Sequence, residues 1–329
     1  MIKKLIAILM ALVLPLIAAS AEEKPEEIDL TYSSRGHGLY RLGNTGYLVE
    51  DCVAYLTDGA YRQIAKQGAE LNALVPLGGD VKKYIYFIES SRSVRLDQDL
   101  SGENEVYKTL LNAFENDGHG TLALDSFADY ANHFYMTDHH WKYTGSYQGY
   151  CDIIRMIFGE DEPLIEPEET VVFEEAPFNG SYNAELGYYQ CQELFTVYRF
   201  PETVPYKAYN GDTPIGKYGR QDTYFKDKYP RITVYNHYGR FYGGDIGELI
   251  LRTEQPDKPN LLLISNSYSN AIELLLTQHF NNIYKVDPRF YKLEQKTDMK
   301  LQKYIKQNEI DMILWMGDIQ AFTAYFPLR

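Results

Sequence analysis

The chain has 329 residues, a formal net charge of −14, 45% apolar residues and 24% charged residues. This balance is ordinary for a globular protein and allows one large buried core. The acidic charge argues against nucleic acid or anionic lipid headgroups as partners. Tyrosine is enriched, with 30 copies against 15 phenylalanines. Its ring and hydroxyl suit both half-exposed β surfaces and wet binding surfaces.

The first 21 residues have the pattern of a secretory signal peptide. Residues 1–4 are basic, residues 5–18 form an apolar run, and residues 19–21 (Ala-Ser-Ala) fit the small-x-small cleavage rule. The run is short for a membrane span, and an uncleaved anchor is the alternative. We therefore expect cleavage after Ala21 and a secreted or extracytoplasmic mature protein.

The mature chain divides by composition. Residues 22–38 are polar and acidic, which predicts a flexible lead-in to one domain over 39–329. Within that domain, residues 160–256 are rich in Tyr, Gly, Pro and charged residues. Such a length is too great for a plain loop, so we predict an irregular β-rich insert. Its short alternating runs lie at 169–173, 194–200 and 232–235.

Hydrophobic periodicity predicts the elements outside this insert. Residues 39–49 predict a hairpin with its turn at 43–46. Downstream, the patterns predict helices over 54–74, 103–116, 147–157, 271–280 and 298–307, and strands over 83–89, 121–124, 261–264, 283–286 and 310–315. Strands that alternate with helices indicate an α/β fold, a parallel sheet with helices on both faces.

Two residues of the cluster at 137–141 could form a general-base pair. A histidine that acts as a base needs a fixed tautomer, and Asp138 could provide this for His140 if a tight turn brings them together. One alternative is an Asp/His metal site, although no third ligand is near in sequence. The other is a helix N-cap by Asp138.

A serine-rich segment at 265–270 follows the apolar strand predicted at 261–264. Open α/β sheets bind ligands where a strand ends and a helix begins, and the free amides of the helix can stabilise an anion there. One of Ser265, Ser267 and Ser269 could therefore be a nucleophile. The alternative is plain N-capping by one of these serines.

These strings resemble the DHHW protein family over residues 39–325. The resemblance is carried by 134–141 (Phe-Tyr-Met-Thr-Asp-His-His-Trp), 265–270 (Ser-Asn-Ser-Tyr-Ser-Asn), 286–291 (Val-Asp-Pro-Arg-Phe-Tyr) and 319–322 (Ile-Gln-Ala-Phe). That family is similar to the alginate O-acetylation proteins, whose SGNH-hydrolase-like domain is circularly permuted. The resemblance therefore implies a three-layer α/β/α, permuted SGNH-like fold.

The resemblance also implies a catalytic triad. Asp138 matches the orienting carboxylate, His140 the general base and Ser267 the nucleophile. We further predict that three residues bind substrate, namely Trp141, Tyr268 and Asn270.

Two positions depart from the family pattern. Asn266 stands where an acidic residue is common, and Asp318 stands where relatives often have Asn. A carboxylate near a developing oxyanion is unfavourable, which argues against Asp245 and Asp318 as oxyanion-hole residues. We expect the backbone amide of Ser267 or Tyr268 to be one donor.

The activity implied is that of an exported O-acetyltransferase or acetylesterase of a cell-surface or extracellular polysaccharide, without a metal or cofactor. The resemblance also implies a membrane-bound O-acyltransferase as a partner that supplies acyl groups. The alternative is a catalytically inactive glycan-binding protein on the same fold. Three cysteines, Cys52, Cys151 and Cys191, allow one disulfide, and the pairing is left open.

Overall fold

The computed structural model describes residues 27–328 except 188–192, 203, 217 and 220–235. The predicted signal peptide, the run at 232–235 and Cys191 lie outside the described residues. Cys52 and Cys151 are buried free thiols. None of the described helices is both long and apolar enough to span a bilayer.

An eight-stranded sheet forms the centre of the molecule, in the order β5-β4-β13-β11-β12-β10-β8-β9. Its parallel part confirms the predicted α/β pattern. The parallel strands are β4 (Lys82–Ile88), β5 (Gly118–Leu122), β11 (Leu261–Ser265), β12 (Asn282–Val286) and β13 (Met312–Gly317). The last strand in sequence, β13, thus lies in the middle of the sheet, between β4 and β11.

The sheet is mixed, because three further strands continue it with antiparallel pairing. They are β8 (Tyr206–Asn210), β9 (Thr213–Ile215) and β10 (Glu248–Thr253). All three come from the stretch that the sequence predicts as an insert. Only β6 (Glu169–Pro177) and β7 (Leu194–Arg199) form a separate two-stranded sheet. Short alternating runs indicate strands but carry no signal of the partner strand, so the sequence could not place them.

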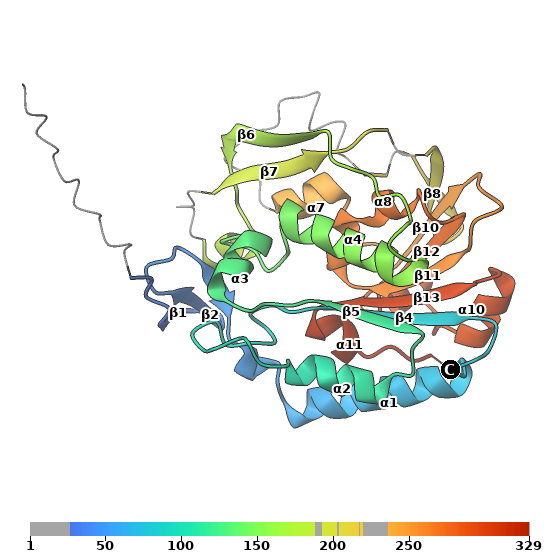
Figure 1. The fold of residues 1–329 in the computed structure, drawn as a ribbon, viewed down its shortest axis with the longest axis horizontal. Helices are drawn as coiled ribbons and strands as arrows, with labels where there is room; N and C mark the ends of the chain where they lie inside the picture. Colours follow the sequence, from blue (N-terminus) through green and yellow to red (C-terminus); the bar gives the residue numbers. More distant parts are fainter. Residues whose placement is uncertain (1–26, 188–192, 203, 217, 220–235, 329) are drawn as a thin grey trace, which may run out of the picture.

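Helices cover both faces of the sheet, which gives the three layers visible in Figure 1. Strand β4 shows how the sequence produces this arrangement. Tyr84, Tyr86 and Ile88 contribute to the core on one face, and Ile85 and Phe87 to the core on the other. The first face carries α3 (Phe127–His133), α4 (Tyr143–Phe158) and α7 (His237–Tyr242); the second carries α1 (Asp58–Leu74), α2 (Glu105–Ala113), α10 (Leu301–Gln307) and α11 (Ile319–Thr323).

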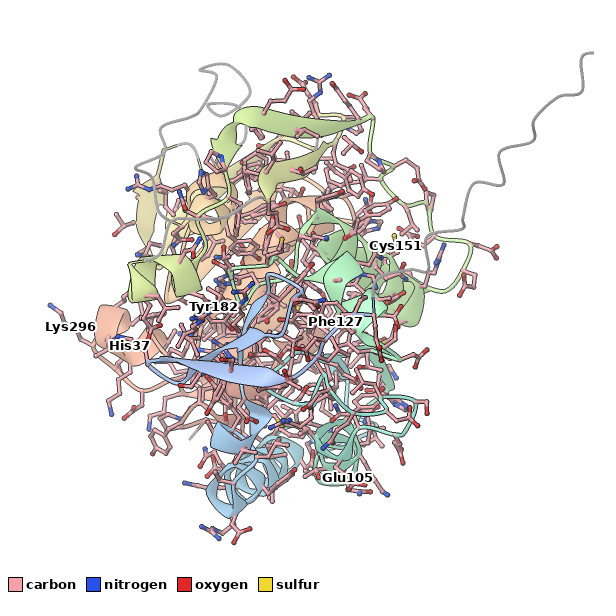
Figure 2. The ribbon with its side chains drawn as sticks, turned by 90° about the vertical axis from the view of Figure 1, so that its left-hand side faces the viewer. His37, Glu105, Phe127, Cys151, Tyr182 and Lys296 are labelled. Atoms are coloured by element: carbon pink, nitrogen blue, oxygen red, sulfur yellow. The ribbon has the colours of Figure 1, made fainter. Side chains whose placement is uncertain are left out.

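The predicted hairpin is present and is part of a small three-stranded sheet of β1 (Tyr32–Gly36), β2 (Leu39–Leu42) and β3 (Leu48–Glu50). His37, labelled in Figure 2, marks the turn between β1 and β2. Strand β1 lies within the stretch predicted as a flexible lead-in over 22–38, of which residues 22–26 are outside the described residues. It is held because the Arg95 guanidinium lies 4.1 Å from the Tyr32 ring centroid and the Tyr32 hydroxyl accepts the Leu96 amide.

Shorter elements complete the chain. The helix predicted at 271–280 is instead two short pieces, a 3₁₀ helix, η2 (Ser267–Ala271), and α8 (Glu273–Leu276). Other short helices within the described residues are η1 (Cys52–Ala54), α5 (Ser181–Leu186) and α9 (Tyr291–Gln295). Residues of α5 pack beneath the small N-terminal sheet, where Tyr182 contacts Leu39 and Leu48 in one apolar cluster.

Candidate active site

Ser267 lies at the carboxyl end of the central parallel strands. It is the first residue of η2 and follows β11, which is flanked by β12 and β13. Ligands bind at this edge in open parallel sheets. The helix is capped by Asn266, whose side chain accepts the Tyr268 amide at 3.3 Å, so Ser267 is not needed as the cap.

The two neighbouring serines have other partners. The Ser265 hydroxyl donates to the Asn266 carbonyl at 3.0 Å, and the Ser269 hydroxyl donates to Glu273 at 2.8 Å. Both serines are fully buried. Of the three candidates in this segment, Ser267 is the one that lines a pocket.

Asp138 and His140 lie on a closed turn between α3 and α4. A β-bridge between Phe134 and Trp141 closes this turn, and the Lys142 amide donates to the His133 carbonyl at 2.8 Å. Asp138 accepts the His140 amide at 2.9 Å, which folds the aspartate back towards the imidazole. The aspartate is not the cap of the next helix, because Lys142 holds the N-cap position of α4.

The turn and the strand end meet in a hydrogen-bonded chain with the geometry of a Ser-His-Asp triad. His140 Nδ1 lies 2.6 Å from Asp138 Oδ1, and His140 Nε2 lies 2.7 Å from Ser267 Oγ. His140 and Ser267 are 127 positions apart in sequence. With Nδ1 directed at the carboxylate, the imidazole can present an unprotonated Nε2 to the serine hydroxyl.

The Asp138 carboxylate is fully buried and held in its ionised form. Burial alone would raise its pKa, but the charge and hydrogen bonds of His140 outweigh burial and lower the pKa below the usual value. Its second oxygen accepts the Ser181 amide at 2.7 Å. The approach requires glycine before Ser181, because a Cβ at Gly180 would lie 2.1 Å from the Thr137 carbonyl oxygen.

The metal alternative fits this arrangement less well. Donor atoms of Asp138, His139 and His140 do lie within 4.8 Å of one another. However, both oxygens of Asp138 already accept backbone amides, and His139 Nδ1 lies 3.0 Å from the Ser181 hydroxyl. Burial lowers the pKa of His139 well below its usual value, and His140 and Arg92 act in the same direction, so His139 is neutral at neutral pH.

Tyr238 on α7 is a site residue that the sequence did not reveal. Its ring stacks on the His140 imidazole, with centroids 3.9 Å apart and planes 8° from parallel. Its hydroxyl donates to the carbonyls of Ser267 at 3.0 Å and Tyr268 at 3.2 Å. Tyr238 therefore holds both the His140 imidazole and the backbone at Ser267 in place. One tyrosine among 30, inside a stretch predicted as irregular β structure, carries no distinguishing signal.

Two of the three residues predicted to bind substrate have a different place. Trp141 and Tyr268 are fully buried and do not line the pocket. The Trp141 indole donates to the Tyr268 carbonyl at 3.0 Å, and the Tyr268 hydroxyl donates to the His139 carbonyl. These aromatic side chains tie the turn to η2, because a buried indole or phenol needs an internal acceptor. The third residue, Asn270, lines the pocket.

A pocket of about 150 Å³ opens over Ser267 and His140. Its wall includes Asn270, Asp245 and Arg289. Arg289 is clamped by Asp287, whose Oδ2 lies 2.6 Å from its guanidinium, and Asp245 lies 3.5 Å away. Two carboxylates therefore offset this cation. The volume accommodates a small acyl group and a few further atoms, since a liquid water occupies about 30 Å³.

The two positions that depart from the family pattern, Asn266 and Asp318, contact each other beside Ser267. Asn266 Nδ2 donates to Asp318 Oδ1 at 2.7 Å, and Asp318 Oδ2 accepts Arg92 at 2.9 Å. Neither residue lines the pocket. Because Asn266 also takes the Tyr268 amide, Ser267 is the better candidate of the two expected backbone donors.

Comparison with solved structures supports the fold. The chain matches a DHHW family protein from Eubacterium siraeum DSM 15702 with a TM-score of 0.64 and 19% identity, covering 91% of this chain and 96% of that one. It matches PatB1 of Bacillus cereus with a TM-score of 0.63 and 17% identity, covering 88% and 99%. The O-acetyltransferase domain of Pseudomonas putida AlgJ gives a TM-score of 0.47 and 12% identity, covering 88% and 94%.

No protein-family model and no curated protein matches the chain by sequence. The structural likeness confirms the expected α/β fold with a mainly parallel sheet and small additional β sheets. It also confirms the predicted resemblance to DHHW proteins at the level of the fold.

Proposed function

We propose that this protein is an exported serine acyl-transfer enzyme, an O-acetyltransferase or acetylesterase of a cell-surface or extracellular polysaccharide. The observation that carries the proposal is the chain of hydrogen bonds from Asp138 through His140 to Ser267, at the floor of a pocket. A nucleophile, a base within hydrogen-bond reach and a third group that orients the base are the elements of acyl transfer.

The geometry supports a two-step reaction. His140 Nε2 accepts the Ser267 proton while Oγ attacks the acyl carbonyl, and the tetrahedral intermediate collapses when His140 returns that proton to the leaving group. A sugar hydroxyl or water then attacks the acyl-enzyme, with its proton passing to His140. The second tetrahedral intermediate collapses as the bond from its carbon to Ser267 Oγ breaks and His140 returns the proton to Oγ. Asp138 stays ionised and stabilises the imidazolium in both steps.

The acceptor and the cellular setting rest on the sequence. The resemblance to DHHW and alginate O-acetylation proteins supports a polysaccharide acceptor and a membrane-bound O-acyltransferase as acyl donor. The pattern of residues 1–21 supports export. The small pocket supports acetyl over a long acyl chain.

The central test is Ser267→Ala. We expect it to lower the turnover of a chromogenic acetate ester by about 10⁴-fold or more and to abolish labelling by a fluorophosphonate. Ser265→Ala, which removes a buried hydroxyl two residues away and outside the pocket, is the matched control and should react like wild type. A wild-type protein that is neither labelled nor active on acetate esters or with an acetyl donor and a glycan would refute the proposal.

The adjacent histidines allow a second test, based on pH. His140→Gln should remove activity, whereas His139→Gln should retain most of it. Because burial holds the pKa of His139 low, this residue stays neutral between pH 6 and pH 9 and adds no ionisation to the rate profile. The shape of the activity curve over that range should therefore be unchanged in His139→Gln. If a pH-dependent rise or fall in activity is lost in His139→Gln, then His139 and not His140 is the base.

The alternative function is glycan binding without catalysis. Its support in the sequence is the departure at Asn266 and Asp318. It would be favoured by glycan affinity that survives Ser267→Ala, together with no acyl-enzyme in the mass spectrum of wild type after incubation with an acetyl donor.

A further inference from the structure

One asparagine that lines the pocket, Asn270, has a hydrogen-bond partner for its side-chain oxygen but none for its side-chain nitrogen among the described residues. Asn270 is 3% exposed and lines the same pocket as Ser267. Its Nδ2 is buried and has no hydrogen-bond partner among the residues that the structure describes. Buried amide N–H groups are nearly always hydrogen bonded, and an exception that borders a cavity next to a nucleophile indicates a bound group that completes it.

The position of Asn270 follows from the short helix. Segment η2 (Ser267–Ala271) is a 3₁₀ helix, in which residues three apart stand above each other on one face. Asn270 is three residues after Ser267. The amide and the nucleophilic hydroxyl therefore share the face of η2 that borders the pocket.

The orientation of the amide is fixed by Lys285 on β12. Lys285 Nζ lies 3.1 Å from Asn270 Oδ1, and the lysine side chain is fully buried. An ammonium group can only donate hydrogen bonds, so the amide must turn its oxygen to the lysine. Its N–H₂ group is consequently the end that has no hydrogen-bond partner among the described residues, on a side chain that lines the pocket.

Lys285 is itself held by a second buried group. Glu273 Oε1 lies 3.4 Å from Nζ, and both side chains are completely buried. Glu273 also accepts the Ser269 hydroxyl at 2.8 Å and the Tyr218 hydroxyl at 2.6 Å. A buried ion pair contributes little net stability because both charges are desolvated. This pair instead fixes one amide beside the nucleophile.

We propose that Asn270 Nδ2 is the side-chain donor of the oxyanion hole and that Lys285 is its positioning residue. The inference rests on the proposed acyl transfer at Ser267. As the bond from Oγ to the carbonyl carbon forms, the carbonyl π electrons move to oxygen, and Nδ2–H donates to that oxyanion without losing its proton. The lysine charge polarises the amide through Oδ1, which makes Nδ2–H a stronger donor.

The first test is Asn270→Asp, which keeps the shape and the contact to Lys285 but removes the donor. We expect kcat for a chromogenic acetate ester to fall by about 10²–10³-fold, with KM changed less than about threefold. Asn104→Asp is the matched control, because Asn104 Nδ2 is also buried without a partner in the described part of the chain, but lies outside the pocket. Its Oδ1, which caps α2, is retained in the aspartate, and kcat should not change.

The second test removes the buried charges together, as Lys285→Met with Glu273→Gln, so that neither charge is left unpaired. We expect kcat to fall by about tenfold at constant KM, and the affinity for phenylboronic acid, which forms a tetrahedral anion on serine, to fall by the same factor. Lys83→Met, at a buried lysine on β4 away from the pocket, is the control. If the double variant does not fold, Tyr218→Phe weakens the hold on Glu273 alone and should lower kcat by a smaller factor at constant KM.

The outcomes separate the two proposals. Normal kcat in Asn270→Asp, with Ser267 still labelled by a fluorophosphonate, overturns the donor assignment and leaves the acyl-transfer proposal intact. Normal kcat and boronate affinity in the folded double variant, or normal kcat in Tyr218→Phe where the double variant fails, overturn the role of Lys285. A wild-type protein without labelling or turnover overturns the acyl-transfer function and, with it, this inference.

Discussion

Two asparagines lie close to Ser267 in sequence, and each contacts a buried ion pair, yet they differ in how much of their amide is hydrogen bonded. Asn266 contacts Asp318, which is paired with Arg92, and both ends of its amide are hydrogen bonded inside the fold. Asn270 contacts Lys285 and uses only its oxygen. The contrast teaches that burial and charge alone do not mark a functional amide. The proposed role of Asn270 rests on a donor that has no partner among the described residues, on a side chain that lines the pocket.

The largest expected effect concerns the Asn266 side, which the contrast identifies as structural. Arg92→Met leaves the buried carboxylate of Asp318 and the partly exposed carboxylate of Glu50 without their cation. We expect a loss of about 3–5 kcal/mol in the free energy of unfolding. Urea unfolding of the variant and wild type measures it. A loss below about 1 kcal/mol would mean that this cluster does not hold the nucleophile segment.

A more direct comparison replaces each asparagine by alanine. Asn266→Ala removes the cap of η2 and one donor from Asp318, so we expect the free energy of unfolding to fall by about 2 kcal/mol. Asn270→Ala removes one internal hydrogen bond and should cost about 1 kcal/mol. For kcat we expect the larger loss in Asn270→Ala and the smaller loss in Asn266→Ala, with both variants assayed at temperatures well below their unfolding transitions. If Asn266→Ala lowers both the free energy of unfolding and kcat more than Asn270→Ala does, the contrast between the two asparagines is wrong.

The smallest expected effect comes from exchanging two partners. Asn266→Asp alone sets two carboxylates face to face, and Asp318→Asn alone sets two amides face to face. The double variant restores one amide and one carboxylate in exchanged positions, which is the arrangement that the family resemblance implies. We therefore expect it to recover about 1–2 kcal/mol relative to the sum of the single changes, in a double-mutant cycle of unfolding free energies. Strict additivity would show that the pair is not coupled.

The sequence was sufficient for the parts of the molecule that depend on local pattern. Apolar runs such as the one at 261–264 predicted the parallel strands, and the spacing of Asp138 and His140 allowed the tight turn that joins them. The assignment of Ser267 to the same site came from the family resemblance, because no local pattern links residues that are 127 positions apart.

The remaining features depend on tertiary contacts. Strand β1 forms because Arg95 and Leu96 come to it from a distant loop. Trp141, which was predicted to bind substrate, is buried, and its indole donates to the Tyr268 carbonyl. An aromatic residue beside a histidine has the same sequence signature whether it faces solvent or an internal carbonyl. The hydrogen bond between Asn270 and Lys285 joins η2 to β12. It could not be predicted from the sequence, because it forms only when these two elements pack together.

The central place of β13 has a consequence for when the protein can first act. Asp138 and His140 belong to the part built on β4 and β5, and Ser267 belongs to the part built on β11 and β12. Only β13, near the end of the chain, pairs with both β4 and β11. During synthesis the earlier strands emerge first, and the two parts share no sheet until the final strand arrives. The meeting of His140 with Ser267, on which the proposed acyl transfer rests, thus depends on β13 having joined the two parts of the sheet.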